Sequence, residues 1–332
     1  MKGLFLIACI ILITACHHQT DKPHFVSNIP NVNLPTIKIK RYDKALFALP
    51  LNNFKDNLKK IAPTYPLFLN INLNDAFIVS DLQKFASDPA NRSLALDVTN
   101  KYSDIFFLET GLTDAFKRSA SFFNGFHSPQ VYTYFSGIDY QFPIRYDGDN
   151  MAIGIDLFLG ADYTAYKRIQ IPLYKTKRMN REMLIPTCMS EVGHYLLSSQ
   201  KPGNTLLDRM IMEGKILLFL DAVLPDTPDN LKIGYNSDQI KWCKENAGNV
   251  WKFFIEHQLF YSTNPEETMN FIQDGPFTLS FGKEAPSRIG AWIGWQIVRK
   301  YMEENKSVTL EQLFKNMDSQ SILEKSGYKP QD

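Results

Sequence analysis

The sequence has no excess of charge of either sign. Among its 332 residues, 36 Lys and Arg stand against 35 Asp and Glu, which gives a formal net charge of +1. Loss of an N-terminal segment containing Lys2 would bring the mature chain to about zero. A protein without a basic surplus lacks the electrostatic signature of nucleic-acid binding or of polybasic attachment to a membrane surface. We therefore expect no nucleic-acid partner.

Cysteine is scarce, with four residues in the whole chain: Cys9, Cys16, Cys188 and Cys243. The first two belong to an N-terminal segment that is treated separately below. Cys188 and Cys243 could form a disulfide in an oxidising periplasm, or they could remain two buried thiols. The sequence leaves both possibilities open.

Long apolar runs are also missing, apart from residues 3–13, which follow Lys2 without a charge. This run is shorter than the roughly 20 apolar residues of a transmembrane helix. A basic start followed by a short apolar stretch is typical of a secretion signal. The following residues 13–16, Ile-Thr-Ala-Cys, resemble the lipobox of bacterial lipoproteins, in which the cysteine is acylated and the peptide is cut before it. We predict a signal peptide at residues 1–15 and lipidation of Cys16.

Two alternatives to lipidation are an uncleaved signal anchor and an ordinary secretory signal with an incidental cysteine. If Cys16 is acylated, two or three acyl chains would hold the protein stably in a bilayer, since each buried methylene contributes about 0.8 kcal/mol. Residues 16–36 contain polar residues and three prolines, so they are expected to form an extended tether. No low-complexity break or repeat divides residues 37–332, and a hydrophobic content of 44% is ample for one globular domain.

Hydrophobic periodicity predicts a mostly α fold with a small antiparallel β-sheet. Apolar residues repeat at helical spacing in residues 51–61, 94–107 and 238–260. In contrast, residues 131–135 and 151–159 are rich in β-branched and aromatic side chains, and turn-forming residues 147–150 lie between them. We expect these two segments to pair as strands of one sheet.

One predicted helix, at residues 182–197, carries chemistry-bearing side chains. It contains Ser190, Glu191 and His194, and Glu213 follows nineteen residues after the histidine. This order resembles the gluzincin metallopeptidases, in which His-Glu-x-x-His on one helix and a glutamate on a later helix bind zinc. The resemblance implies a gluzincin-like architecture whose preceding sheet holds a substrate-binding edge strand. A chance match, with Glu191 and His194 as a surface pair, is the alternative.

The motif departs from that family at Ser190, which stands where the first histidine is required. Residues four apart share a helix face, but a neutral hydroxyl is a poor zinc ligand. Only His194 and Glu213 remain as ligands if zinc is bound, one fewer than a catalytic zinc site needs. Glu191 would then have no metal-activated water to deprotonate. We therefore predict a degenerate site without catalysis, bound metal or cofactor.

No other histidine supplies the missing ligand. Three of the remaining five lie in the tether, and the spacing of the other two recommends neither as a ligand. These residues are His17, His18 and His24 in the tether, and His127 and His257 in the body.

The body as a whole resembles the gliding-motility lipoprotein family B of Bacteroidota, GldB, over residues 38–330. The resemblance is carried by residues 39–43 (Ile-Lys-Arg-Tyr-Asp) with 46–47 (Leu-Phe), 154–160 (Gly-Ile-Asp-Leu-Phe-Leu-Gly), 205–215 (Thr-Leu-Leu-Asp-Arg-Met-Ile-Met-Glu-Gly-Lys), 233–235 (Ile-Gly-Tyr), 242–243 (Trp-Cys), 259–263 (Leu-Phe-Tyr-Ser-Thr) and 287–298 (Ser-Arg-Ile-Gly-Ala-Trp-Ile-Gly-Trp-Gln-Ile-Val). The resemblance implies a non-catalytic, membrane-anchored accessory or stabilising component of the gliding motility and type IX secretion machinery. Its partners would be other envelope proteins of that machinery. An active zinc metallopeptidase with a non-standard ligand set is the alternative.

The same resemblance bears on the side of the membrane. In these bacteria, acidic residues directly after the acylated cysteine accompany export to the cell surface. Here Cys16 is followed by His-His-Gln-Thr, and Asp21 is the first acid. We therefore expect a periplasm-facing anchor, in either the inner or the outer membrane.

The segment at residues 287–298 supports two further expectations. Gly290 and Gly294 lie four apart on an apolar helix, which allows another backbone to approach closely, either in the core or from a partner. Arg288, at the start of this helix, is expected to face Glu213 or Glu191. It would then replace the missing cation, because a buried carboxylate without a partner is costly. The predicted cleft therefore consists of Ser190, Glu191, His194, Glu213 and Arg288.

Overall fold

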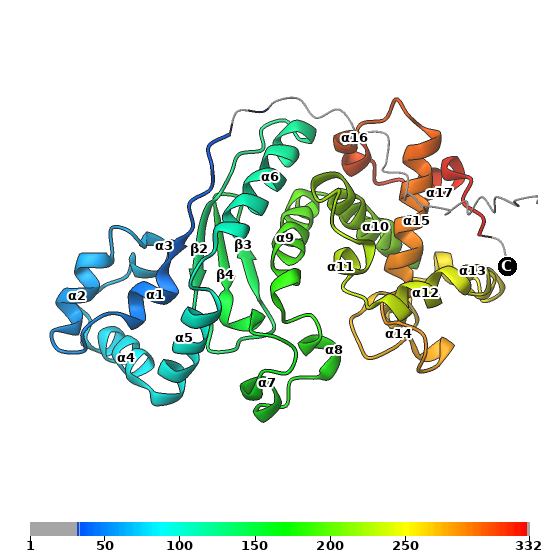
Figure 1. Cartoon of the computed structure of the whole chain (residues 1–332). Coiled ribbons are helices and arrows are strands. Elements are labelled where there is room, and N and C mark those ends of the chain that lie inside the picture. Colours follow the sequence, from blue (N-terminus) through cyan, green and yellow to red (C-terminus); the bar gives the residue numbers. More distant parts are fainter. Residues whose placement is uncertain (1–31, 33, 331–332) are drawn as a thin grey trace, which may run out of the picture.

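Helices lie on both sides of one small sheet (Figure 1). The structure is a computed structural model and describes residue 32 and residues 34–330. The predicted signal peptide, Cys16 and most of the predicted tether lie outside the described residues.

Short helices lead from the first strand to the rest of the sheet. They are arranged as β1 Lys40–Arg41, α1 Tyr42–Phe47, α2 Phe54–Ile61, α3 Pro66–Leu69, α4 Ala76–Ser87, α5 Pro89–Lys101 and α6 Phe106–Phe122. The remaining strands are β2 Gln130–Tyr134, β3 Ile144–Tyr146 and β4 Asn150–Gly154, followed by the 3-10 helix η2 Ile155–Phe158.

The second half of the chain is helical. Its first elements are α7 Thr164–Arg168, α8 Leu173–Thr176, η3 Arg181–Met183, α9 Leu184–Ser198, α10 Leu206–Val223 and α11 Asp229–Ile233. It continues with α12 Ser237–Glu245, α13 Ala247–Glu256, η4 Leu259–Tyr261, α14 Pro265–Ile272, η5 Leu279–Phe281, α15 Ile289–Glu304, α16 Leu310–Lys315 and α17 Ser319–Ser326. The prediction of a mostly helical chain with a small sheet is confirmed.

The sheet is mixed, so the prediction of an antiparallel sheet is wrong in part. Its strand order is β1-β2-β4-β3, in which β2 is parallel to both β1 and β4 and only β3 and β4 are antiparallel. Strand β3 lies before the predicted turn and runs opposite to β4. Its three residues are too few to show a periodic pattern. Two reversals therefore bring β2 and β4 into the same direction. The turn residues do form a hairpin, in which Asp147 accepts hydrogen bonds from the backbone N–H groups of Asp149 and Asn150.

The predicted second strand also ends early, because residues 155–158 form η2 instead of extended chain. The fully buried carboxylate of Asp156 accepts hydrogen bonds from the backbone N–H groups of Ser136 and Ile138 and from the Ser136 hydroxyl. These bonds draw the chain inward after Gly154. An apolar run of this length cannot distinguish a buried strand from a buried helical turn.

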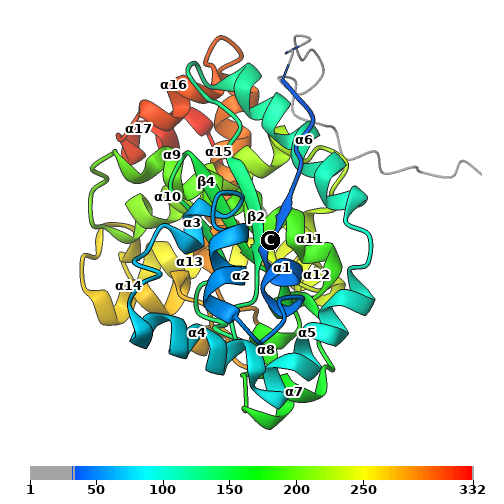
Figure 2. The same ribbon diagram turned by 90° about the vertical axis from the view of Figure 1, so that its left-hand side faces the viewer.

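The sheet separates a large core from a small one. Val131, Met151 and Ile153 face the large core, which the helices from α5 to the C-terminus share. On the other face, Tyr132 meets Phe68 of α3 with ring centroids 5.7 Å apart, beside a smaller cluster formed by α1 to α4. Figure 2 shows these N-terminal helices lying over the sheet.

Two predicted helices are each divided. Residues 94–107 belong to α5 and α6, separated at the buried Tyr102, whose hydroxyl donates to the Phe158 carbonyl at 2.5 Å. Residues 238–260 form α12, α13 and η4, and Asn246 both ends α12 and begins α13. Tertiary hydrogen bonds and caps stop these helices where the apolar pattern alone continues.

Helices α10 and α15 form the tightest contact of the fold. A Cβ atom added at Gly294 would lie 1.8 Å from the Met210 carbonyl oxygen, and one at Gly214 would lie 2.4 Å from the Gly294 backbone. Gly290 faces Phe271, Ile272 and Met210. The predicted close approach at the two glycines therefore occurs inside the core, where Trp292 and Trp295 are buried as well.

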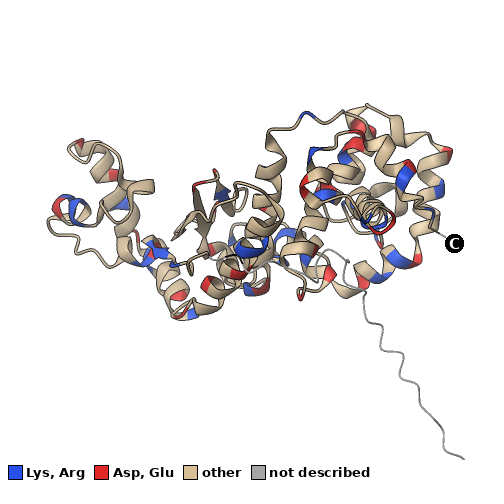
Figure 3. Ribbon diagram, turned by 90° about the horizontal axis from the view of Figure 1, so that it is seen from above, with Lys and Arg blue, Asp and Glu red and all other residues tan. Residues whose placement is uncertain are grey.

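The surface carries both signs of charge throughout. Figure 3 shows Lys and Arg interspersed with Asp and Glu along the helices. Within the part of the chain that the structure describes, no helix is long and apolar enough to cross a membrane.

Candidate functional site

Three helix segments bring the predicted site residues together. Helix α9 carries Ser190, Glu191 and His194, and it packs against α10, which carries Glu213. Helix α10 starts with a reciprocal cap between Thr205 and Asp208, which fixes its first turn. Arg288 is the N-cap residue of α15 and holds a left-handed backbone with φ +60°.

Glu213 is the centre of this group because one of its oxygens faces Arg288 and the other faces His194. Its Oε2 lies 2.9 Å from Arg288 Nη2, and its Oε1 lies 3.9 Å from His194 Nε2. The other Arg288 amino group donates to the Ile233 carbonyl at 3.3 Å. His194 Nδ1 lies 2.9 Å from the Ser190 carbonyl oxygen. Arg288 therefore faces Glu213 and not Glu191.

The charges shift the pKa values of the group. Burial alone would raise the pKa of Glu213, but His194 and Arg288 outweigh burial and lower that pKa to about 2. Burial acts to lower the pKa of His194, yet Glu213, Glu191 and the Ser190 carbonyl together raise it. The imidazole is about half exposed, at 47%, so water screens its pair with Glu213 more than it screens the pair with Arg288. Glu213 is thus held ionised mainly by the better-shielded arginine.

Glu191 differs from Glu213 in having no partner. Within residues 34–330 its carboxyl group forms no hydrogen bond and no ion pair within 4 Å, and the Ser190 hydroxyl beside it is also without a hydrogen bond. Burial raises the pKa of Glu191, an effect that His194 partly offsets. An unpaired, partly buried carboxyl group is available to a ligand.

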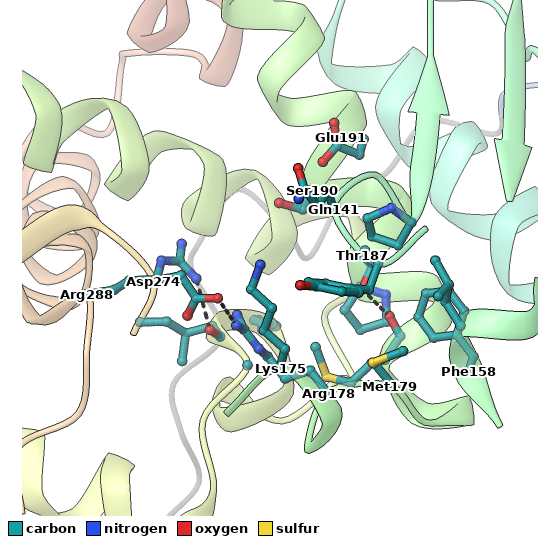
Figure 4. A pocket seen from close by; sticks show the side chains of 18 residues that line it. Gln141, Phe158, Lys175, Arg178, Met179, Thr187, Ser190, Glu191, Asp274 and Arg288 are labelled. Atoms are coloured by element: carbon teal, nitrogen blue, oxygen red, sulfur yellow. Dashed lines mark hydrogen bonds and ion pairs between the residues drawn. The ribbon is translucent and has the colours of Figure 1, made fainter. Parts of the chain in front are cut away.

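Glu191 and Ser190 line a pocket of about 330 Å³ (Figure 4). Arg288 also lines the pocket, whereas His194 and Glu213 do not. Apolar side chains of η2 and of the segment before α9 form another wall, including Leu157 and Phe158. The predicted cleft residues are thus brought together, but they divide between the pocket and the ion-paired group behind it.

The donor set does not fit a catalytic zinc ion. Among the predicted cleft residues, His194 and Glu213 are the two possible ligands that approach each other, and Arg288 already pairs with one Glu213 oxygen. No group of three His, Cys, Asp or Glu side chains in the described residues is arranged to hold a metal. A further cation placed beside Glu213 would also meet the positive charge of Arg288. Three protein ligands are the usual requirement of a catalytic zinc site.

The remaining candidate residues lie outside this group. His127 pairs with Asp149 at 2.8 Å, and His257 stacks on Phe253 with ring centroids 4.1 Å apart. Cys188 and Cys243 are both buried, free thiols. The structure therefore selects the two-thiol alternative over the disulfide.

Sequence reasoning missed other polar residues that line the pocket. Lys175 and Arg178 come from α8 and the turn after it, Gln141 from the loop before β3, and Asp274 from the segment after α14. For Lys175 and Arg178, the sequence offers one signal, the cluster of Lys and Arg between residues 167 and 181. Nothing in that cluster indicates which members share a cavity with Glu191.

A comparison with protein families connects this architecture to a known group. The sequence model described as Gliding motility protein GldB matches residues 21–330, nearly the entire chain. The chain belongs to the GldB family. It is therefore related to gliding motility, and membership in a lipoprotein family fits a lipid-anchored protein of the cell envelope. No curated protein and no solved structure matches the chain.

Three of the segments that carry the resemblance to GldB contribute to the site. Residues 205–215 cover the start of α10 with Glu213, and residues 287–298 cover Arg288 and the start of α15. Residues 154–160 include η2, whose Leu157 and Phe158 line the pocket. The GldB-like segments therefore build both the ion-paired group and one wall of the pocket.

Proposed function

We propose that this chain is a non-catalytic, membrane-anchored periplasmic lipoprotein that acts as an accessory or stabilising component of the gliding motility and type IX secretion machinery. Its partners are other envelope proteins of that machinery, and acylated Cys16 attaches it to the bilayer. The observation that carries the proposal is the Arg288–Glu213 pair at 2.9 Å, since it places an arginine cation against the carboxylate that a zinc site would use. Membership in the GldB family supports the gliding role.

The cleft is best understood as a degenerate gluzincin site. Two features support this origin: His194 and Glu213 approach each other from consecutive helices, and the edge strand β3 packs beside α9. Ser190 then marks the loss of the first histidine ligand. Under this proposal Glu191, once a general base, is left as a binding group in the pocket.

The second candidate function is a zinc metallopeptidase with a non-standard ligand set. The approach of His194 Nε2 to Glu213 Oε1 at 3.9 Å favours it, as does the raised pKa of Glu191. It requires a bound metal, whereas the accessory role requires only a binding surface. Metal content therefore separates the two candidates.

The decisive experiment combines genetics with metal analysis. Deletion of the gene should impair colony spreading or export of type IX cargo, and the wild-type gene should restore it. A deletion strain normal in both would reject the gliding role. The purified protein should contain no stoichiometric zinc. Zinc at one equivalent, lost in His194→Ala and in Glu213→Gln, would reject the non-catalytic role and support the peptidase.

A further inference from the structure

The cations that line the pocket beside Ser190 and Glu191 are paired, with one exception. Three of them face carboxylates: Arg178 faces Asp274, Lys232 lies 2.8 Å from Asp221, and Arg288 lies 2.9 Å from Glu213. Lys175 has no ion pair within residues 34–330. Its ammonium group points into the cavity (Figure 4) and lies 5.0 Å from the centroid of the Tyr140 ring. The pocket therefore holds one cation that is free to meet an anionic group.

The carboxylates that line the pocket show the same pattern. Asp274 is taken by Arg178, while Glu191 has no partner among the described residues. Lys175 and Glu191 do not pair with each other, because no ion pair within 4 Å joins them. Polar groups in a partly enclosed site are costly when they lack hydrogen bonds. A ligand that offers both an anion and hydrogen-bond donors would satisfy both groups.

Part of the pocket wall is apolar. Met179, Met183 and Phe158 contribute to its wall, and a volume of about 330 Å³ is at the lower end of the range of ligand pockets. Exposed apolar side chains neighbour the lining residues along the chain: Phe142, 54% exposed, follows Gln141, and Leu173, 67% exposed, precedes Lys175 by two residues. Apolar surface thus continues on the segments that form the pocket, as expected where a larger partner docks.

We propose that this pocket binds a polypeptide segment of a partner protein through one carboxylate, either a chain terminus or an acidic side chain. The carboxylate pairs with Lys175, backbone N–H groups donate to Glu191, and an apolar side chain packs on Met179 and Met183. A fatty acid offers no donor to Glu191. A phosphate group would find a single unpaired cation, although such groups are usually held by several. The proposal rests on the proposed function, since it identifies what the accessory protein recognises.

The test measures peptide binding to the full-length chain purified in detergent micelles, by isothermal titration calorimetry. The probes are acetyl-Gly-Ala-Leu-Leu as the free acid, the same peptide as the C-terminal amide, and acetyl-Gly-Ala-Asp-Leu amide. The free acid should bind roughly tenfold or more tightly than its amide, because a charge-assisted hydrogen bond is lost in the amide. Comparable binding of the Asp peptide would assign the carboxylate to a side chain, and weak binding would assign it to a chain terminus.

Variants locate the effect. Lys175→Met should abolish the preference for the free acid, whereas Lys177→Met should retain it, because Lys177 is exposed and does not line the pocket. Glu191→Ala should weaken the binding of the free acid and of the amide to a similar extent. Equal affinities of wild type for the free acid, the amide and the Asp peptide, equal losses in the two lysine variants, or no binding of any probe would each overturn the proposal. A normal deletion strain together with Lys175-dependent binding would reject the gliding role and leave this site standing.

Discussion

Arg288 adopts a backbone conformation that arginine rarely uses. Its φ of +60° lies in the left-handed region, which costs a residue with a Cβ atom roughly 1–2 kcal/mol. In that conformation its side chain reaches both the Glu213 carboxylate and the Ile233 carbonyl. Strained residues persist where surrounding contacts outweigh their cost. The ion pair with Glu213 is the contact that offsets the strain at Arg288.

Arg288→Met should therefore destabilise the protein by about 3 kcal/mol at neutral pH, because it leaves a mostly buried carboxylate without its partner. The lowered pKa of Glu213 stabilises the folded state above its usual value of 4.5, and this contribution is lost as pH falls toward about 2. The stability difference between wild type and variant should then shrink on acidification. Urea unfolding at neutral pH and at about pH 3 measures it.

Arg168→Met is the matched control for this measurement. Arg168 is exposed and has no ion pair or hydrogen bond within the described chain, so its replacement should change stability by less than about 0.5 kcal/mol. If Arg288→Met is no more destabilising than this control, the ion pair is not what holds Glu213. A difference that stays constant from neutral to acidic pH would show that the loss arises from packing and not from charge.

At the scale of secondary-structure elements, the α10–α15 pair depends on two backbones that touch. Gly294→Ala should destabilise the protein by at least about 3 kcal/mol, since its Cβ would lie 1.8 Å from the Met210 carbonyl oxygen. Both atoms are attached directly to helix backbones, so neither can move aside without shifting a whole helix. Gly275→Ala is the control, because its Cβ would meet no atom nearer than 3.9 Å. Thermal unfolding compares the two. Similar melting temperatures for both variants would contradict the close approach.

Helix α10 also carries Lys215, whose ammonium group is buried and donates to the Asn316 carbonyl after α16. Burial lowers the pKa of Lys215 to about 8. The unfolded chain therefore binds more protons than the folded one between about pH 8 and the ordinary value of 10.5, so this group makes stability rise with pH there. The slope should approach about 1.4 kcal/mol per pH unit.

Lys215→Met should remove this rise while leaving other alkaline titrations in place. The measurement is the difference in unfolding free energy between wild type and variant at a series of pH values from about 7 to about 10. That difference should move in favour of the wild type as pH increases. If the difference does not change with pH, the folded state does not lower the pKa of Lys215.

The elements that the sequence predicts well are those with a long repeating pattern. The spacing of Ser190, Glu191 and His194 on one helix follows from the 3.6-residue period. The expectation that Arg288 faces Glu213 or Glu191 follows from the cost of a lone carboxylate, and the structure selects Glu213. Strand β3 could not be predicted, because three residues show no period. Lys175 could not be assigned to the pocket either, since tertiary packing alone brings α8 to the pocket that Glu191 lines.

At the scale of the whole molecule, the mixed surface charge offers no broad field to hold the body at a membrane. The proposed function assigns attachment to the predicted lipid on Cys16. Cys16→Ser should prevent acylation and release the protein from the membrane fraction, because each buried methylene lost removes about 0.8 kcal/mol of binding. Fractionation and labelling with a radioactive fatty acid test this prediction.

Cys9→Ser is a close control, because it makes the same chemical change seven residues earlier, inside the segment predicted to be removed. It should leave both labelling and membrane attachment intact. Labelling that survives Cys16→Ser would contradict the predicted lipobox. Loss of labelling with retained membrane attachment would mean instead that either the uncleaved apolar segment 3–13 or a partner holds the protein at the membrane. Combining Cys16→Ser with Lys175→Met separates the two, because the double variant should be released only if a partner bound in the pocket holds the body in place.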